Sequence, residues 1–189
     1  MSTVSIIGSG NMANAIGGLA ASGGHTVEYI GRDTAPIAGD IVVLAVPYPE
    51  VTAVIAAHGA ALAGTIVVDI TNPLNFETFD DLVVPADSSA AAEIASKLPD
   101  STVLKAFNTT FAATLVSKKV GSGQTTVLIA GDDAAAKSAL AEIIVAGGVA
   151  AVDAGSLKRA RELEAIGFQQ LVLAVGEKIS WTGGFGLNA

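Results

Sequence analysis

The chain has 189 residues, of which 51% are hydrophobic and 15% charged, and its formal net charge is −8. This length suits one domain with a well-buried core, and an acidic protein offers no counter-charge to nucleic acid or to an anionic membrane. Cysteine is absent, which excludes disulfides, thiol catalysis and cysteine metal sites. No basic signal segment or membrane-length apolar stretch is visible. We therefore expect a cytoplasmic protein with no nucleic-acid partner, no membrane association and no metal.

Short runs rich in valine and isoleucine recur along the chain, each bounded by glycine, aspartate or proline. They are almost continuously apolar, which is typical of parallel strands covered on both faces. The expected strands are 4–7, 27–30, 41–46, 66–70, 103–107, 126–130 and 149–152, and helices are expected over 12–22, 49–59, 90–97 and 134–146. This alternation predicts an α/β fold with a doubly wound, mainly parallel sheet of the Rossmann type.

The first expected strand runs directly into Gly8-Ser9-Gly10-Asn11-Met12, and a helical pattern follows. Gly8 permits a tight turn, and Gly10 lets a ligand approach the backbone. The free amides of Asn11 and Met12, at the positive end of the helix, would face a pyrophosphate. The order of strand, glycine turn and helix predicts a dinucleotide phosphate-binding site. The alternative is a turn that only packs closely.

A basic residue, Arg32, follows the second expected strand, where the adenosine ribose of a dinucleotide would lie. NAD-specific sites place a carboxylate there, whereas a guanidinium suits the extra phosphate of NADP, so we predict NADP as the cofactor. Alternatively, Asp33 reaches the ribose, or Arg32 is a solvated residue paired with Asp33. Only nine residues, 32–40, lead to the next strand. They are too few for a helix and a strand, but when extended they span roughly 30 Å and can return along the sheet.

The carboxyl ends of three further strands should line the same crevice, because ligands of open parallel sheets lie there. Asparagine side chains at these ends offer hydrogen bonds to a carboxamide or a ribose. The residues expected to flank the nicotinamide are Ala45, Val46, Pro47, Asn72, Ala106 and Asn108. Alternatively, each of them only satisfies loop backbone.

The last part of the chain predicts a long helix over 158–181, with Leu163, Ile166, Leu173 and Ile179 on one face. The opposite face is apolar too, so this helix needs cover on more than one side. We expect residues 1–155 to form the dinucleotide-binding domain. Residues 156–189 should form a helix and tail that pack on the same domain or on a partner in a homodimer.

No acid–base pair, nucleophile or cluster of metal ligands stands out, so no catalytic residue is assigned. His25 and His58 are interpreted as surface residues. Lys105 lies in an apolar strand and is expected to extend its ammonium group to solvent, although a base of perturbed pKa is an alternative. Glu162 and Glu164, on the final helix, are given no functional role.

Several segments occur in the order found in a known family. They are Ile6-Ile7-Gly8-Ser9-Gly10-Asn11-Met12, the segment 41–47 that ends in Ala-Val-Pro, Val68-Asp69-Ile70-Thr71-Asn72-Pro73, Lys105-Ala106-Phe107-Asn108-Thr109 and the closing Gly183-Gly184-Phe185-Gly186-Leu187. Over nearly the whole chain they resemble the NADP oxidoreductase family typified by deazaflavin-dependent NADP reductase. The resemblance implies direct hydride transfer between deazaflavin and nicotinamide, without an essential acid–base side chain. Membrane ferric reductases of the same superfamily carry a similar domain, so flavin or metal reduction is an alternative.

The main hypothesis is an enzyme, an NADP(H)-dependent oxidoreductase that passes hydride between the nicotinamide and a flat small-molecule partner such as flavin or deazaflavin. A non-catalytic NADP-binding module that senses redox state fits the absence of catalytic side chains equally well. A small imine or carbonyl reductase is the third hypothesis. It needs a proton donor, which only Lys105, Tyr48 or a threonine hydroxyl could provide.

Overall fold

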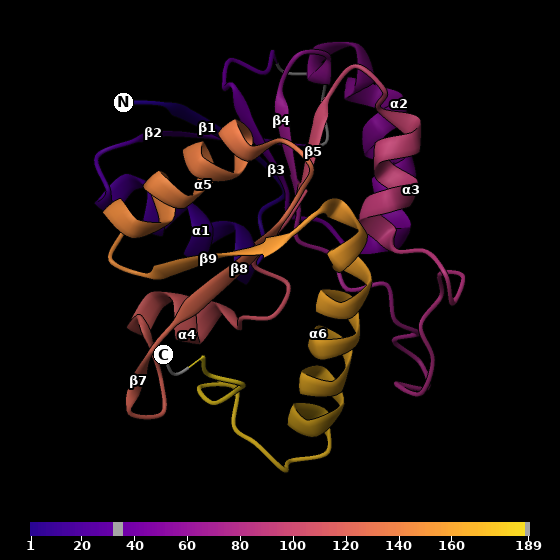
Figure 1. The fold of residues 1–189 in the computed structure, drawn as a ribbon, viewed down its shortest axis with the longest axis vertical. Helices are drawn as coiled ribbons and strands as arrows, with labels where there is room; N and C mark the ends of the chain where they lie inside the picture. The colour runs from indigo at the N-terminus through magenta and orange to yellow at the C-terminus, as the bar shows by residue number, and fades with distance from the viewer. Residues whose placement is uncertain (32–35, 188–189) are drawn as a thin grey trace.

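The computed structural model describes residues 1–31 and 36–187 (Figure 1). Its centre is a seven-stranded sheet in the order β2-β1-β3-β4-β5-β8-β9. The strands are β1 (Thr3–Ile7), β2 (Thr26–Ile30), β3 (Ile41–Leu44), β4 (Ile66–Asp69), β5 (Thr102–Lys105), β8 (Thr126–Ala130) and β9 (Ala150–Gly155). All neighbouring pairs from β2 to β5 are parallel. The predicted doubly wound, mainly parallel α/β fold is confirmed.

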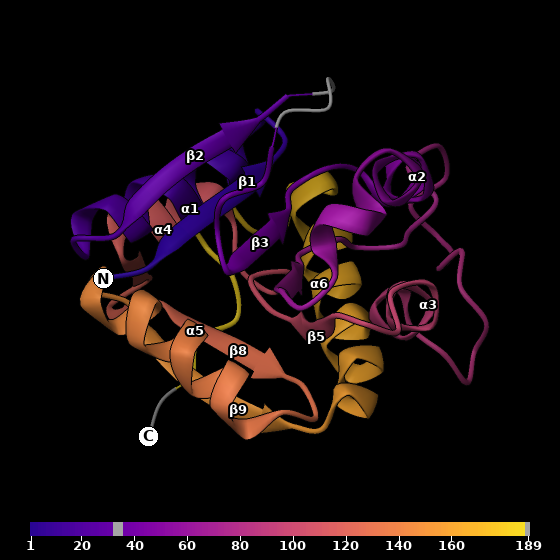
Figure 2. The same cartoon turned by 90° about the horizontal axis from the view of Figure 1, so that it is seen from above.

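Helices cover both faces of the sheet, as the view in Figure 2 shows. One face carries α1 (Asn11–Ser22), α4 (Ala112–Ser117) and α5 (Ala134–Ala146), and the other carries α2 (Val51–Leu62), α3 (Ala90–Lys97) and α6 (Ala160–Val175). Successive strand residues point to opposite faces, so Val43 packs under α1 and α5 while Val42 and Leu44 pack under α2 and α3. Within the described ranges no helix is long and apolar enough to cross a membrane.

Strand β8 runs in the direction opposite to the one predicted. It pairs with β5 antiparallel, with Lys105 opposite Ala130, and β9 continues parallel to β8. Between β5 and β8 lie α4 and a small hairpin of β6 (Lys119–Val120) and β7 (Gly123–Gln124), none of which the sequence predicted. Helix α4 has only six residues and is too short to carry the chain back along the strands. Strand β8 therefore starts beyond the end of β5 and runs back toward it, so that the last residues of the two strands lie opposite each other.

The connection between β2 and β3 is described at residues 31 and 36–40, which form no helix or strand. Glu28 on β2 accepts hydrogen bonds from the Ser5 hydroxyl and, at 2.8 Å, from the Ala38 N–H. The Gly39 N–H donates to Ser5 Oγ at 2.9 Å. These bonds to its carboxylate lower the pKa of Glu28, the Ser5 bond most of all. The extended return over 32–40 stays a prediction, because only residues 36–40 of this segment belong to the described residues. Arg32 and Asp33 lie outside them.

The C-terminal helix is shorter than the predicted 158–181. After a 3₁₀ turn at Leu157–Arg159, α6 ends at Val175, where Glu177 adopts a left-handed conformation with φ +57°. The Lys178 N–H then returns to the Leu173 carbonyl at 2.8 Å, which closes the last turn. Residues 176–187 form a tail that reaches the β6–β7 hairpin (Figure 1). The tail and the hairpin line a pocket of about 300 Å³.

Candidate functional site

The glycine turn between β1 and α1 has two features. At Gly8 the backbone passes close to the backbone of Ala45, and at Gly10 the space beside the start of α1 is open. Gly8 has φ +129°, and a Cβ there would lie 2.2 Å from the Ala45 carbonyl oxygen, so only glycine fits. A Cβ at Gly10, by contrast, would meet nothing within 4 Å. The first intrahelical bond runs from the Asn14 N–H to the Gly10 carbonyl at 3.0 Å. The preceding N–H groups, at Asn11 and Met12, are thus free to bind an anion at the positive end of α1.

A cavity of about 440 Å³, here called the α2 cavity, opens beside this turn. Its volume lies in the range of small-molecule sites, about 300–1,000 Å³. The lining is mainly apolar, and no lysine or arginine of the described residues belongs to it. The lining residues are Ile7, Gly8, Ser9, Gly10, Ile30, Gly31, Ala45, Val46, Pro47, Glu50, Ala53, Val54, Ala57 and His58, which include six of the predicted site residues.

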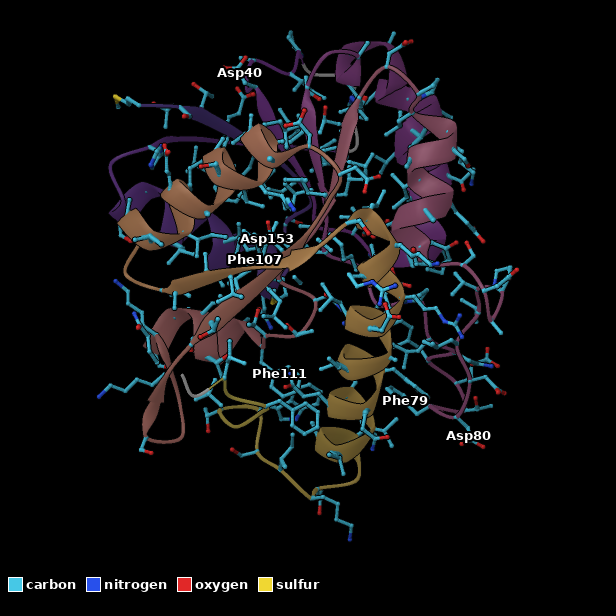
Figure 3. The ribbon with its side chains drawn as sticks, in the orientation of Figure 1. Asp40, Phe79, Asp80, Phe107, Phe111 and Asp153 are labelled. Carbon is cyan, nitrogen blue, oxygen red and sulfur yellow. The ribbon has the colours of Figure 1, made fainter. Side chains whose placement is uncertain are left out.

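A second cavity of about 350 Å³, here called the α6 cavity, lies on the other side of the helix start. It is lined by Asn11, Met12, Ile70, Asn72, Phe107, Asn108, Thr110, Phe111, Ala112, Ala113, Leu171 and Trp181, which include four predicted site residues. Phe111, labelled in Figure 3, packs beside Trp181 with their ring centroids 4.9 Å apart. Because Gly10 lines one cavity and Asn11 lines the other, both cavities border the glycine turn.

Two asparagines in the α6 cavity fix each other. Asn108 Nδ2 donates to Asn72 Oδ1 at 3.0 Å and to the Leu163 carbonyl at 2.8 Å, while Asn72 Nδ2 donates to the Asn108 carbonyl at 3.0 Å. Asn108 Oδ1 is buried without a hydrogen-bond partner in the described part of the chain. A Cβ on Gly167 would lie 2.3 Å from Asn72 Oδ1, so the missing side chain lets α6 pack directly on the pair.

Lys105 is fully buried, which corrects the prediction that its ammonium group reaches solvent. The ammonium donates to Asp69 Oδ2 at 2.8 Å and to the Thr71 carbonyl at 2.6 Å, and it pairs with Glu164 Oε1 at 2.8 Å. These three contacts use its three N–H donors. The sequence suggested an exposed lysine because its partners are distant in the chain, on β4 and α6. An ammonium group in an apolar strand stays charged only with such partners.

The sequence predicts no functional role for Glu164, yet its carboxylate joins three elements of the fold. Besides Lys105 it accepts the N–H groups of Ala90 and Ala91, at 2.9 and 3.3 Å, at the start of α3. Burial raises the pKa of Glu164, although Lys105 and the Ala90 N–H oppose the shift. One signal was available: Glu164 shares a helix face with Leu163 and Gly167, where a carboxylate must be paired.

The sequence also led to predictions for two histidines and for Ala106. His58 is 5% exposed and lines the α2 cavity, so its interpretation as a surface residue is wrong. His25 is half-buried, and its Nδ1 accepts the Ser2 N–H at 3.3 Å. Ala106 is fully buried in the core and belongs to the lining of neither cavity. The described residues include no cluster of three or more acidic or histidine side chains that could hold a metal.

A parallel sheet, a glycine turn before a helix and a crevice at the carboxyl ends of the strands define a Rossmann-type nucleotide-binding protein. The chain is 32% identical over 149 residues to the F420-dependent NADP reductase of Methanocaldococcus jannaschii, covering 76% of this chain and 66% of that protein. It is 35% identical over 180 residues to metalloreductase STEAP3 of Rattus norvegicus, covering 86% of this chain and 36% of that protein. The chain belongs to the NADP oxidoreductase family, as its motifs predicted.

A solved structure gives the same fold over the full length. A protein of Arthrobacter sp. FB24, provisionally described as an F420-dependent NADP reductase, superposes with a TM-score of 0.87 at 24% identity, covering 100% of both chains. No family model matches the chain.

Proposed function

We propose that the chain is an NADP(H)-dependent reductase that passes hydride between the nicotinamide and a flat acceptor such as a flavin or deazaflavin. The observation that carries this proposal is the row formed by the α2 cavity, the open helix start and the α6 cavity, which border the same glycine turn. A dinucleotide is elongated, with an anionic centre between two heterocyclic ends, and this row matches that order. The two NADP- and metal-reducing relatives support the cofactor and the reaction class.

The glycine turn would hold the pyrophosphate. Gly8, Ser9 and Gly10 supply backbone without obstructing side chains, and the N–H groups of Asn11 and Met12 would donate to the phosphate oxygens. The adenosine would occupy the α2 cavity, against the wall made by Ala45, Val46 and Pro47.

The nicotinamide would occupy the α6 cavity. The unpartnered Oδ1 of Asn108 is suited to accept a hydrogen bond from the carboxamide, and Asn72 keeps that side chain in place. Ala106 contributes through its carbonyl, which accepts the Asn108 N–H at 2.8 Å. When bound, NADPH supplies the hydride. The part of the protein is to orient the ring toward the acceptor and to exclude water.

The imine or carbonyl reductase alternative finds less support in the positions of the possible proton donors. Lys105 is fully buried with its three N–H groups engaged, and it lines neither cavity. The Tyr48 hydroxyl donates to Glu93, and burial raises the Tyr48 pKa. Thr110 lines the α6 cavity, but its hydroxyl donates to the Phe107 carbonyl at 2.7 Å. Direct hydride transfer needs none of these groups.

The test of the proposal is NADPH oxidation with flavin, deazaflavin and quinone acceptors, each measured at steady state. Turnover with at least one flat acceptor is expected. A protein that binds NADP tightly but oxidises NADPH with no acceptor would instead be the redox-sensing module. A protein that binds neither NADP nor NADPH would overturn both hypotheses.

Cofactor preference is the second part of the proposal. A charge-assisted contact from Arg32 to the extra phosphate, of about 1.5–3 kcal/mol, implies that NADP binds roughly ten- to a hundredfold more tightly than NAD. Titration of both cofactors against the wild type and Arg32→Ala measures this preference. Equal affinities, or a preference that survives in Arg32→Ala, would assign the selection to Asp33.

We also propose a homodimer, because large apolar side chains of α6 and the tail remain exposed. They are Ile166, Val175, Trp181, Phe185 and Leu187. A twofold partner presenting the same surface would cover them. Light scattering at micromolar concentration is expected to give twice the chain mass of 18.8 kDa. A stable monomer that binds NADP would contradict the dimer alone.

A further inference from the structure

His58 is a buried polar side chain on a helix that is otherwise apolar where it faces the sheet. The buried residues of α2 are Val51, His58 and Leu62. His58 is 5% exposed, and the surface it retains faces the α2 cavity, beside Val54 and Ala57. The His58 side chain is therefore part of the wall that a ligand in this cavity would contact.

Within the described residues, no hydrogen bond is made by the His58 ring. The buried side-chain atoms without a partner in the described part of the chain are Thr71 Oγ1 and Asn108 Oδ1, so the ring nitrogens of His58 keep some accessible surface and are open to a ligand. The contrast with the other histidine is direct, since His25 already accepts the Ser2 N–H at 3.3 Å. A ligand in the α2 cavity would supply the contact that His58 lacks.

The walls around His58 indicate the chemistry of that ligand. Ala53 and Ala57 leave a shallow apolar surface on α2, and the cavity volume is about 440 Å³. Among the described lining residues Glu50 is acidic and none is a lysine or arginine. This part of the cavity thus suits a neutral planar heterocycle better than a phosphate. A neutral imidazole offers one donor and one acceptor, and a purine edge offers both in return.

We propose that the imidazole of His58 recognises the adenine base of the cofactor by a hydrogen bond in the α2 cavity. The inference rests on the proposed function, because it takes the α2 cavity as the adenosine site. It adds a side chain that selects the base, whereas the glycine turn binds only through its backbone.

The experiment is isothermal titration of wild type, His58→Leu and His58→Gln with NADP, 5′-AMP and adenosine 2′,5′-bisphosphate. Loss of one neutral hydrogen bond should weaken all three ligands in His58→Leu by the same factor, roughly three- to tenfold. His58→Gln keeps one donor and one acceptor and should lose less. His25→Leu is the matched control, at a histidine outside the cavity lining, and should bind all three like the wild type. Thermal melts establish that each variant is folded.

Three results would overturn the inference. The first is a folded His58→Leu that binds 5′-AMP as tightly as the wild type does. The second is a loss confined to adenosine 2′,5′-bisphosphate, which would place the contact on the 2′-phosphate. The third is an equal loss for ribose 5-phosphate in an NMR titration, which would place it on the sugar. If wild type binds no nucleotide at all, the proposed function itself fails, and that outcome is distinct from the other three.

Discussion

The α2 cavity and the α6 cavity lie on either side of the same helix start, but their polar groups are held in different ways. In the α2 cavity the glycine turn, Glu50 and His58 are set among mainly apolar walls, and the His58 ring has no hydrogen-bond partner among the described residues. In the α6 cavity, Asn72 and Asn108 are fixed by each other and by the Leu163 carbonyl of α6.

A buried charged cluster lies behind the α6 cavity. Lys105, Asp69 and Glu164 tie the ends of β4 and β5 to α6, and Asn72 and Asn108 follow those two strand ends. Under the proposed function, this comparison gives cofactor binding and nicotinamide orientation separate supports in the chain. Changes on the α6 side should act on stability and turnover, and changes on the α2 side should act on affinity.

The largest expected effect comes from Lys105→Met, which removes the shared cation and leaves two buried carboxylates. Breaking a buried pair in this way should lower the free energy of unfolding by about 3–5 kcal/mol. Urea denaturation measures it. Lys137→Met is the matched control, because Lys137 pairs at 2.8 Å with an Asp153 side chain that is 59% exposed. Loss of that surface pair should cost about 1 kcal/mol or less. Similar losses in the two variants would mean that the buried cluster contributes nothing special.

Gly10→Val tests the helix start that the two cavities share. The added side chain would enter the open space beside Gly10, where the pyrophosphate is proposed to lie. Loss of a charge-assisted contact should weaken NADP binding at least about tenfold while the chain stays folded. Gly18→Val is the matched control, because Gly18 is an exposed residue of the same helix where an added Cβ would also meet nothing within 4 Å. This variant should bind NADP normally. Normal binding by folded Gly10→Val would remove the glycine turn from the site.

Gly167→Ala acts on the α6 side alone. The methyl group would lie 2.3 Å from Asn72 Oδ1 and must push α6 away from the asparagine pair. Overpacking of this kind should lower the free energy of unfolding by about 1–3 kcal/mol and should reduce turnover more than 5′-AMP affinity. At the exposed Gly18, the same change to alanine should instead stabilise the chain by up to about 1 kcal/mol. An equal loss of turnover and of 5′-AMP affinity would contradict the separation of the two sides.

The smallest expected effect is a pH dependence from Glu164. Burial raises its pKa in the folded chain above the ordinary value of 4.5, so the folded state keeps this proton to higher pH. The resulting stability is present below the unfolded-state pKa and is lost as the pH rises through the folded-state pKa. The free energy of unfolding should therefore decline from about pH 4.5 upward in wild type, and Glu164→Gln should lack that part of the slope. Parallel pH profiles for the two proteins would assign the slope to other groups.

The sequence predicts well what depends on neighbouring residues. The helices over 90–97 and 134–146 have the predicted bounds, and the glycine turn has the open N–H groups expected of it. Helix α6 ends at Val175 with Gly176 as its C-cap, a signal that the sequence contained, and Glu177 then takes a left-handed conformation. The direction of β8 depends on how α4 and the hairpin fold, and both have too few residues for a clear periodic signal.

The candidate site divides in the same way. Ten of the twelve predicted site residues line one of the two cavities, since the carboxyl ends of parallel strands share one edge. The sequence does not show which side chains are buried together, because these contacts join residues that lie far apart in the chain. Lys105 and Glu164 explain each other only once α6 lies against β5, and the orientation of His58 depends on which face of α2 the sheet covers.

The position of Glu164 near the end of the chain has a consequence for the order in which the chain folds during its synthesis. Lys105 and the exposed N–H groups at the start of α3 emerge from the ribosome well before α6 does. Until then the ammonium group has Asp69 but lacks its second carboxylate, and the sheet cannot close over it at low cost. The nascent β4–β5 region should therefore stay open until α6 is synthesised, although β1, β2 and α1 can already fold. Completion of the α6 cavity becomes a late event in biogenesis, and a ribosome stalled before residue 164 would carry a chain without it.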